Sequence, residues 1–507
     1  MAGRTILAAG LSLWLAGCAV SPQVLTEEEI AGFTAENLER LAAQQAPITG
    51  PVSLYEAMAR ALKYNLDFRV EQMKEALAVS EAALTSWEML PKLVANAEAS
   101  RRSNQPGGRS VSLLTGIESL EPSRSTERTT LTADLTFSWN ILDFGLSWVR
   151  ARKAADKVLI AAERRRKAVN RIMEDVRTAF WRAASGQSLS GSLARLERRV
   201  QRALRAARRM ARSGETTPLT ALTYERELVQ IRRQIRQLEA ELKTAKVQLA
   251  ALMNVPPGAK FTLRIPKHRR LPNVARMDVK QMIATALKNR PELREAAYRQ
   301  RINQAEAEAA LLELLPGIAP YVAANVDAND LLYNNSWVTW GAKASWNLMR
   351  LFRYPARKKS IEAREKVLKA QALALTMAVM TQVHIARVRY LAQRRIYASA
   401  SEYLDVQRRI LRQVKAARDT DAASEQTLIR EEMNTLLARA RHDVAYADLQ
   451  NALAALYASM GLDPLPGVVP AELSVKQLAL KLKRAWERPN VWRVAMAAAP
   501  TPMPMKK

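Results

Sequence analysis

The sequence has one cysteine, 17 glycines and three histidines in 507 residues. A single thiol excludes an intramolecular disulfide and any metal site built from several thiolates. The histidines, His268, His384 and His442, are far apart and lack metal-ligand spacing, so neither a metal site nor a cofactor is predicted. No phosphate-cradling glycine loop and no nucleophile elbow is present. These absences argue against an enzyme.

Long hydrophobic runs are also missing. Beyond Val20 no stretch reaches the ~18 apolar residues that a transmembrane helix needs. Any membrane-spanning portion would have to be a closed β-barrel, because helices and barrels alone satisfy all backbone hydrogen bonds in lipid. The chain is rich in Ala, Leu, Arg, Glu and Gln and poor in Gly, a composition that favours long helices elsewhere.

The segment from Met1 to Val20 has the organisation of a secretory signal peptide. An apolar stretch from Ile6 to Leu15 is followed by Ala16-Gly17-Cys18. Small residues before the only cysteine resemble a bacterial lipobox, in which the thiol is acylated and the cysteine becomes the mature N-terminus. We therefore expect lipidation of Cys18 and sorting to the outer membrane. The alternative is an ordinary signal peptide in which Cys18 occurs by chance.

Positive charge is in excess, with 78 Lys and Arg against 49 Asp and Glu and a formal net charge of +29. Basic clusters such as Arg164-Arg165-Arg166-Lys167 could form a nucleic-acid contact surface. However, acidic residues are interspersed among them, aromatic stacking residues do not accompany them, and the chain carries an export signal. Solvated helix faces or contacts with anionic envelope components are favoured, and no nucleic-acid partner is predicted.

The chain contains an internal duplication. Leu90-Pro91 recurs as Leu315-Pro316, and Trp139-Asn140 recurs as Trp346-Asn347 at a shorter spacing. The second half is therefore shorter between these two points, and the difference is placed in one loop, because an indel in a long coiled coil would shift its apolar seam. Each half is predicted to contain, in order, a helix, two strands joined by a loop, a long helix, a turn and a helix.

Four segments alternate between apolar and polar residues, as transmembrane β-strands do. The clearest are residues 130–140 and 338–347, and shorter ones cover 93–100 and 322–327. Glu98, Asp134 and Lys343 all fall on the polar face, as a water-filled lumen would permit. The alternative is a soluble two-stranded hairpin in each half with one face packed on a core.

The helices are predicted to be long and coiled. The first helix of each half begins after Ser53 or Asp278, both good N-cap residues, and is expected to run unbroken to Leu90 or Leu315. A helix from about Leu146 to Arg212 would be about 100 Å long. Apolar residues spaced by three and four predict that it pairs with a second, antiparallel helix. This seam comprises Leu189, Leu193, Leu196, Val200, Ala203, Ala207 and Met210, facing Leu228, Ile231, Ile235, Leu238, Leu242, Ala245, Leu249 and Leu252.

The predicted fold is mostly α with a small membrane β-barrel portion. It has duplicated halves, a long antiparallel coiled-coil α-barrel and four β-strands per protomer. Four strands cannot close a barrel, since small closed barrels need about eight or more. The chain must therefore oligomerise, and three copies would form a 12-stranded barrel.

These features resemble the TolC-like outer membrane factor (outer membrane efflux protein) family of the lipoprotein type. The resemblance rests on the duplicated halves, Leu-Pro before the first strand, the run Trp-Asn-Ile-Leu-Asp-Phe-Gly from Trp139 to Gly145, and the Gly-x-x-x-x-Leu turn at Gly214 to Leu219. It covers nearly the whole mature chain. The second half departs from the pattern, because residues 350–353 and 418–424 lack the corresponding glycines.

The resemblance implies an outer membrane channel subunit of a tripartite efflux or type I secretion system, a passive export duct from periplasm to exterior. It implies a homotrimer anchored in outer membrane lipid with a periplasmic helical extension. A periplasmic adaptor and an inner-membrane pump are the implied partners. The alternative is a periplasmic structural or adaptor coiled-coil lipoprotein without a channel. The sequence does not identify the cargo.

In this family the two helical tips of each protomer converge on the narrow end of the tube, where carboxylates constrict it. The resemblance therefore assigns the channel constriction to Asp419 and Asp421. The alternative is helix capping, because Asp421 or Thr420 could cap the returning helix. By resemblance, the adaptor-docking residues are Arg212, Gly214, Leu219, Leu222 and Arg418.

The expected organisation places a signal peptide at residues 1–17 and an N-terminal extension at 18–52. The first repeat covers 53–253, a linker 254–277 and the second repeat 278–460. In the tail, 461–507, Ser474-Val475-Lys476-Gln477-Leu478 echoes Asp278-Val279-Lys280-Gln281-Met282. Linker and tail are therefore expected to contribute to a belt beside the middle of the long helices, and the end of the tail is expected to be disordered.

Overall fold

The computed structural model describes residues 23–462, except 43–44, 110, 113, 120, 125, 214–216, 257, 266–270, 272–273, 275–276 and 421, together with residues 473–487. Helix α2 (Glu27–Ala42) precedes two repeats of like composition. The first contains α3 (Leu54–Tyr64), α4 (Leu66–Trp87), β1 (Lys92–Arg101), β2 (Thr129–Ser138), α5 (Ile141–Ser213) and α6 (Pro218–Leu252). The second contains α7 (Val279–Asn289), α8 (Pro291–Leu312), β3 (Gly317–Asp327), β4 (Ser336–Ser345), α9 (Met349–Asp419) and α10 (Glu425–Ser459), and α11 (Val475–Glu487) follows it.

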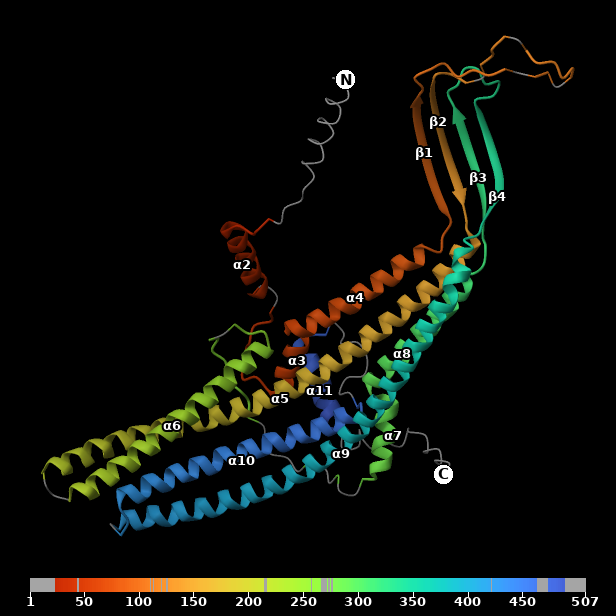
Figure 1. Cartoon of the computed structure of the whole chain (residues 1–507). Helices are drawn as coiled ribbons and strands as arrows, with labels where there is room; N and C mark the ends of the chain where they lie inside the picture. The colour runs from red at the N-terminus through yellow and green to blue at the C-terminus, as the bar shows by residue number, and fades with distance from the viewer. Residues whose placement is uncertain are drawn as a thin grey trace.

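The molecule is a long helical rod with a small sheet at one end (Figure 1). The two long helices, α5 and α9, run from the sheet to two hairpin tips at the opposite end. The short helices α3, α7 and α11 lie midway along the rod and form its belt. This confirms the predicted class, a mostly helical chain with duplicated halves and four strands.

The first helix of each repeat is not continuous, and the prediction of an unbroken helix was wrong. Asn65 adopts an extended backbone conformation, φ −63° and ψ 127°, and its side chain accepts a hydrogen bond from the amide of Phe68. It therefore ends α3 and caps α4. In the second repeat Arg290 has the same conformation because Pro291 follows it and disfavours a helical residue before the ring. Ser53 and Asp278 do cap α3 and α7, as predicted.

The four strands form one antiparallel sheet in the order β1-β2-β3-β4. The register pairs Leu135 of β2 with Ala95 of β1 and with Ala324 of β3. Because side chains alternate between faces along a strand, this pairing places most of the large apolar residues of the four strands on one face, with Val94 and Trp337 on the other. The two repeats therefore contribute two strands each to a single sheet, with β1 and β4 at its edges.

An asparagine after the second strand begins the long helix in both repeats. The side chain of Asn140 accepts from the amides of Leu142 at 3.0 Å and Asp143 at 3.2 Å. Asn347 likewise accepts from the amide of Met349 at 3.2 Å. Asn347 precedes the N-cap Leu348, so α9 begins within one residue of the equivalent place although the second repeat lacks the glycine of the first.

The predicted coiled-coil seam is the core of the first hairpin. Leu189, Leu193 and Val200 of α5 and Leu228 and Ile235 of α6 are fully buried. Leu238 and Leu242 pack against them and are partly buried. Gly186 permits the close approach of these helices, because a Cβ there would lie 2.9 Å from Leu242 Cβ. Met210, near the tip, is 38% exposed.

The belt has its own core, which includes a buried cation. Val475, Leu478 and Leu482 of α11 pack into a cluster formed by α3, α5 and α6. Arg177 of α5 is 3% exposed, and its guanidinium lies 4.3 Å from the ring centroid of Trp486 on α11. Its Nη2 donates to Gln450 Oε1 at 2.9 Å. Burial lowers the pKa of Arg177 to about 10, so the side chain remains charged at neutral pH.

Candidate functional site

The two hairpin tips lie at the same end of the rod (Figure 1). Near this end α10 packs against the first hairpin, since Ile429 and Met433 are buried in the α5–α6 core. Ion pairs add to this contact: Arg199 of α5 lies 3.1 Å from Glu425 and 2.7 Å from Glu432 of α10. Glu227 of α6 lies 2.6 Å from Arg430 of α10. The tips of one protomer therefore form a single unit.

Three residues predicted to dock a partner are exposed at or near the first tip. Leu219 and Leu222 are 76% and 61% exposed on the first turns of α6. Arg212 is exposed in the last turn of α5, where its Nε donates to the carbonyl of Arg208 at 3.3 Å. The neighbouring Arg208 pairs with Glu225 at 2.7 Å. Gly214 lies outside the described residues.

At the second tip, the capping alternative is wrong. Ser424 caps α10, because its hydroxyl accepts from the amide of Thr427 at 3.1 Å. Thr420 is instead the C-cap of α9, and its hydroxyl donates to the carbonyl of Ala417 at 3.1 Å. Asp419 is exposed at the end of α9, one residue after Arg418, which lies 3.6 Å from Glu425. Asp421, like Cys18, lies outside the described residues.

The sheet has two chemically different faces. On the polar face, Asn96 Nδ2 donates to Asp134 Oδ2 at 3.0 Å, and Asn325 Nδ2 donates to Thr339 Oγ1 at 3.0 Å. Glu98, Asp134 and Lys343 do share this face in the observed register, as predicted. The opposite face exposes large apolar side chains: Leu93, Leu131, Leu135, Phe137, Val322, Val326, Val338 and Trp340, between 47% and 71% exposed.

Two apolar seams run along opposite edges of the protomer. The helices near the sheet contact one another in the order α4, α5, α8, α9. On the outward side of α4 the exposed residues are Leu66, Val70, Met73, Leu77, Leu84 and Trp87, spaced by three, four or seven. On the outward side of α9 they are Val367, Leu373, Met377, Ile385, Val388, Ile396, Tyr403, Val406 and Ile410. A helix with apolar residues on two opposite sides is expected to pack against other elements on both sides.

The two repeats are joined by an antiparallel series of ion pairs between α5 and α8. The end nearest the sheet pairs Arg152 with Glu308 at 2.9 Å, and the belt end pairs Lys167 with Glu292 at 4.0 Å. Between them are Lys153–Glu306, Asp156–Arg301, Glu163–Arg294 and Arg164–Glu295. We call this series the α5–α8 zipper. Burial acts to raise the pKa of Glu306, but the hydrogen bond from Lys153 and the nearby Arg364 and Arg357 hold it below its usual value.

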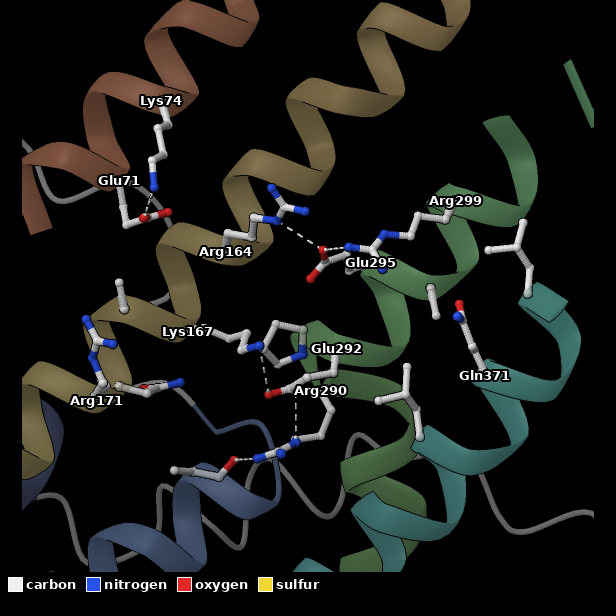
Figure 2. A pocket seen from close by; sticks show the side chains of 17 residues that line it. Glu71, Lys74, Arg164, Lys167, Arg171, Arg290, Glu292, Glu295, Arg299 and Gln371 are labelled. Carbon is white, nitrogen blue, oxygen red and sulfur yellow. Dashed lines mark hydrogen bonds and ion pairs between the residues drawn. The ribbon is translucent and has the colours of Figure 1, made fainter. Parts of the chain in front are cut away.

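A hollow of about 640 Å³ opens beside the belt end of the zipper (Figure 2). Glu295 accepts from Arg164 at 3.0 Å and from Arg299 at 2.6 Å, and Arg290 lies 3.1 Å from Glu292. Six cations and three carboxylates line the hollow, so its formal charge is +3: Lys74, Arg164, Lys167, Arg171, Arg290 and Arg299, with Glu71, Glu292 and Glu295. Part of the excess positive charge of the chain therefore lines this hollow between α4, α5, α8 and α9.

Within the described part of the chain, no group of three or more His, Cys, Asp or Glu side chains is arranged to hold a metal ion.

None of the helices in the described ranges is long and apolar enough to cross a membrane.

Sequence reasoning missed the zipper and the second seam of α9. The zipper did leave a signal in the sequence. When residues 292–308 are read in reverse order, their charged positions match residues of opposite charge in 152–167. Recognising that signal requires knowing that α5 and α8 are antiparallel neighbours. The α9 seam was readable as a 3–4 spacing, but which of its apolar sides faces outward depends on the packing of α8 and α10.

Comparison with known proteins identifies the fold. Residues 57–255 match the family of outer membrane efflux proteins. A search of curated proteins found no match. The outer-membrane channel OprN has a similar structure, with a TM-score of 0.60 and 16% identity over 80% of this chain and 89% of that one.

Two further solved structures are similar. The CmeC outer membrane channel of Campylobacter jejuni has a TM-score of 0.62 and 12% identity, covering 92% of this chain and 98% of that one. The outer membrane protein VceC of Vibrio cholerae has a TM-score of 0.60 and 14% identity, covering 80% of this chain and 96% of that one. At such identities the likeness shows a shared fold.

Proposed function

Because the chain belongs to the outer membrane efflux protein family, we propose that three copies assemble into an outer membrane duct of a tripartite efflux or type I secretion system. The duct is passive, and the protein is not an enzyme. A periplasmic adaptor and an inner-membrane pump supply cargo and energy. The channel fits the family match and the structural neighbours better than the alternative, a periplasmic coiled-coil lipoprotein without a channel.

The main observation behind this proposal is that the four-stranded sheet is open, with an unpaired strand edge on each side. β1 and β4 are edge strands, and they end a four-stranded sheet whose apolar face is exposed. Backbone groups on an open edge cannot be left unpaired in lipid, so β1 of one copy pairs with β4 of the next. Three copies supply twelve strands, and the polar face with Asp134 and Lys343 then lines the lumen.

The apolar seams of the helices support the same arrangement of copies as the strand pairing. α4 and α9 lie at opposite edges of the protomer, just as β1 and β4 do in the sheet. When β1 of one copy meets β4 of the next, the α4 seam is brought to the α9 seam of that copy. Large exposed side chains such as Met73 and Leu77, at 57% and 58%, then become buried between copies.

The first test is assembly and conductance of the purified full chain. We expect detergent-extracted protein to have the mass of three copies and to produce stepwise conductance in planar bilayers. Native mass spectrometry and single-channel recording measure the two properties. A stable monomer in detergent that keeps its strand content would contradict the proposal, because its sheet edges would then be tolerated without partners.

A second prediction concerns the anchor. We propose that Cys18, in the lipobox-like sequence Ala16-Gly17-Cys18, carries the lipid that holds the mature chain to the membrane. Intact-mass analysis should find a diacylglyceryl thioether on an N-terminal cysteine, and the variant Cys18→Ser should lack it. A mature chain that starts at Ala19 or later would exclude lipidation.

A third prediction concerns the periplasmic tips. Two aspartates per copy, Asp419 and Asp421, give six in a trimer, and we propose that they form a cation-attracting ring at the narrow end. Replacing both with Asn should raise single-channel conductance. It should also raise the Ca²⁺ concentration for half block about tenfold, which corresponds to about 1.4 kcal/mol. Planar-bilayer recording measures both.

Asp405→Asn is the matched control, because Asp405 is an exposed aspartate of the same helix that pairs with Arg409 at 3.6 Å. It should leave Ca²⁺ block unchanged. If the double tip variant trimerises and conducts like the unmodified protein, the two aspartates do not constrict the channel. Arg212, Gly214, Leu219, Leu222 and Arg418 remain the proposed adaptor-docking residues.

A further inference from the structure

The hollow beside the belt end of the zipper is more positive than its own carboxylates can balance. Two of its three carboxylates are shared between cations. Glu292 lies 3.1 Å from Arg290 and 4.0 Å from Lys167, and Glu295 lies 3.0 Å and 2.6 Å from two arginines. The formal charge of +3 is therefore left unbalanced among side chains that lie close together, where like charges repel.

Arg171 and Lys167 are the cations of α5 that are least tied to carboxylates. Arg171 forms no ion pair with the described residues. Burial raises the pKa of Asp175, and the charge of Arg171 opposes that rise. Lys167 is 47% exposed and only reaches Glu292 at 4.0 Å. The two cations lie one turn apart on the side of α5 that lines the hollow (Figure 2), so both can contact a ligand there without breaking a short ion pair.

The first turn of α8 adds to the positive potential. Pro291 and Glu292 begin this helix and line the hollow. Arg290 is the N-cap residue, and its side chain makes no capping hydrogen bond. The amides at the start of a helix carry together about +0.5 elementary charge and favour an anion. The helix end and the cations therefore act on the same space.

The hollow is large and open enough for a small polyanion. Its volume of about 640 Å³ lies within the range of roughly 300–1,000 Å³ found for small-molecule sites. The side chains of Lys74, Arg164 and Arg299 are 60%, 52% and 46% exposed, so a ligand can enter from solvent.

The charge of the hollow selects the class of anion. A phosphate group carries about −1.5 to −2 near neutral pH, so one such group offsets most of the +3. A single carboxylate would leave +2. Guanidinium groups also bind phosphate oxygens through two parallel hydrogen bonds, and the hollow has four arginines.

The position of the hollow indicates where such an anion comes from. β2 has ten residues and spans roughly 33 Å, close to the ~30 Å of a hydrocarbon core. Lys167 follows the first residue of α5, Ile141, by 26 residues, so it lies about 39 Å farther along the rod. With the sheet in the bilayer, lipid headgroups are too distant to reach it, and the ligand must be water-soluble.

We propose that this hollow binds a soluble multivalent phosphate anion: inorganic phosphate, pyrophosphate or the phosphate group of a small molecule. Lys167 and Arg171 contact it from the first repeat. Arg290 and Arg299 contact it from the second, beside the N-terminus of α8. The anion thereby joins the two repeats where the zipper has its longest pair, Lys167 with Glu292. All lining residues belong to one chain, and only the exclusion of lipid headgroups rests on the proposed function.

Titration of the purified full chain with phosphate and pyrophosphate tests the site. At constant ionic strength, both anions should raise the temperature at which the helical circular-dichroism signal is lost, because a ligand of the folded state stabilises it by mass action. Isothermal titration calorimetry should find one anion bound per chain. Absence of saturable binding for both anions would overturn the proposal.

A pair of double variants locates the binding. Lys167→Gln/Arg171→Gln should raise the phosphate concentration for half saturation about tenfold, because two charge-assisted contacts are lost. Arg171→Gln alone, which breaks no ion pair with a described residue, should change it in the same direction. The matched control is Arg198→Gln/Arg202→Gln, two exposed arginines of the same helix at the same spacing, and it should bind like the unmodified protein. Equal weakening in both double variants would mean that phosphate responds to overall charge and not to the hollow.

Proteoliposomes distinguish the two sources of phosphate. Protein in phosphatidylcholine with phosphate in the buffer should show the thermal shift, and protein in phosphatidylglycerol without added phosphate should not. The opposite result would assign the site to lipid headgroups and overturn the proposal. Native mass and conductance of the same protein report the proposed assembly separately. A conducting trimer that binds no phosphate would refute this site alone, whereas a monomer that binds it would refute the assembly alone.

Discussion

Replacing Leu135 with arginine should remove nearly all assembled protein from the outer membrane. Leu135 lies in the middle of β2, is 47% exposed on the apolar face, and pairs with Ala95 and Ala324 on the adjacent strands. If this face contacts lipid, an arginine near the bilayer midplane costs about 2–4 kcal/mol. That cost corresponds to about 30-fold to 700-fold less inserted protein at equilibrium. The amount of trimer in membrane fractions, resolved on semi-native gels, measures the effect.

The matched control is Thr132→Arg in the same strand. Thr132 is on the opposite face, where its partners are Glu98 on β1 and Asp327 on β3. An arginine there meets two carboxylates in water, so trimer yield should stay within about twofold of the unmodified protein. Equal loss of trimer in both variants would show that the sheet tolerates arginine on neither face, and the assignment of one face to lipid would fail.

Replacing Arg301 with methionine should be the most destabilising single change in the zipper. Asp156 is 6% exposed, and Arg301 Nε donates to its Oδ2 at 2.9 Å. The hydrogen bond with Asp156 also raises the pKa of Arg301, despite the opposing effect of desolvation. The Asp156 side chain is 9% exposed and that of Arg301 is 48% exposed, so only the carboxylate is buried. Without the guanidinium this carboxylate loses its ionic partner, at a cost of about 1–2 kcal/mol. The temperature at which the helical circular-dichroism signal is lost should fall accordingly.

Arg152→Met is the control in the same zipper. Its pair with Glu308 has the same 2.9 Å separation, but the two side chains are 41% and 49% exposed. Solvent screens such a pair, so the change should cost about 0.5 kcal/mol or less. Adding Asp156→Asn to Arg301→Met should recover part of the lost stability, because the unpaired charge is then gone. Equal destabilisation by Arg301→Met and Arg152→Met would refute the role of burial.

The local sequence pattern located the residues of the first tip but not the residue that caps α10. Leu219 and Leu222 were identifiable as tip residues because a turn signal precedes them, and they are indeed exposed at that tip. The cap of α10 was placed too early, at Thr420 or Asp421. Ser424 takes this role because the chain makes one more turn after α9, with the amides of Ala422 and Ala423 bonded to the carbonyl of Ala417.

The sequence by itself determined the strands, the coiled-coil seam and the duplication. These depend on periodicity, and a period of two or of three and four requires no knowledge of distant neighbours. Thus the alternation around Leu135 was sufficient to orient a strand, and the spacing of Leu228 and Ile235 was sufficient to define a buried seam.

Only the tertiary structure decided the break at Asn65, the α5–α8 zipper and the docking of α11 over Arg177. Asn65 has no proline after it, and its capping role depends on the different directions that α3 and α4 must take around the belt. Asp156 and Arg301 belong to different repeats, and Arg177 and Trp486 are still farther apart along the chain. Whether such charges pair or remain solvated is set by the register and burial of packed helices, because Coulomb attraction is strong only where water is excluded.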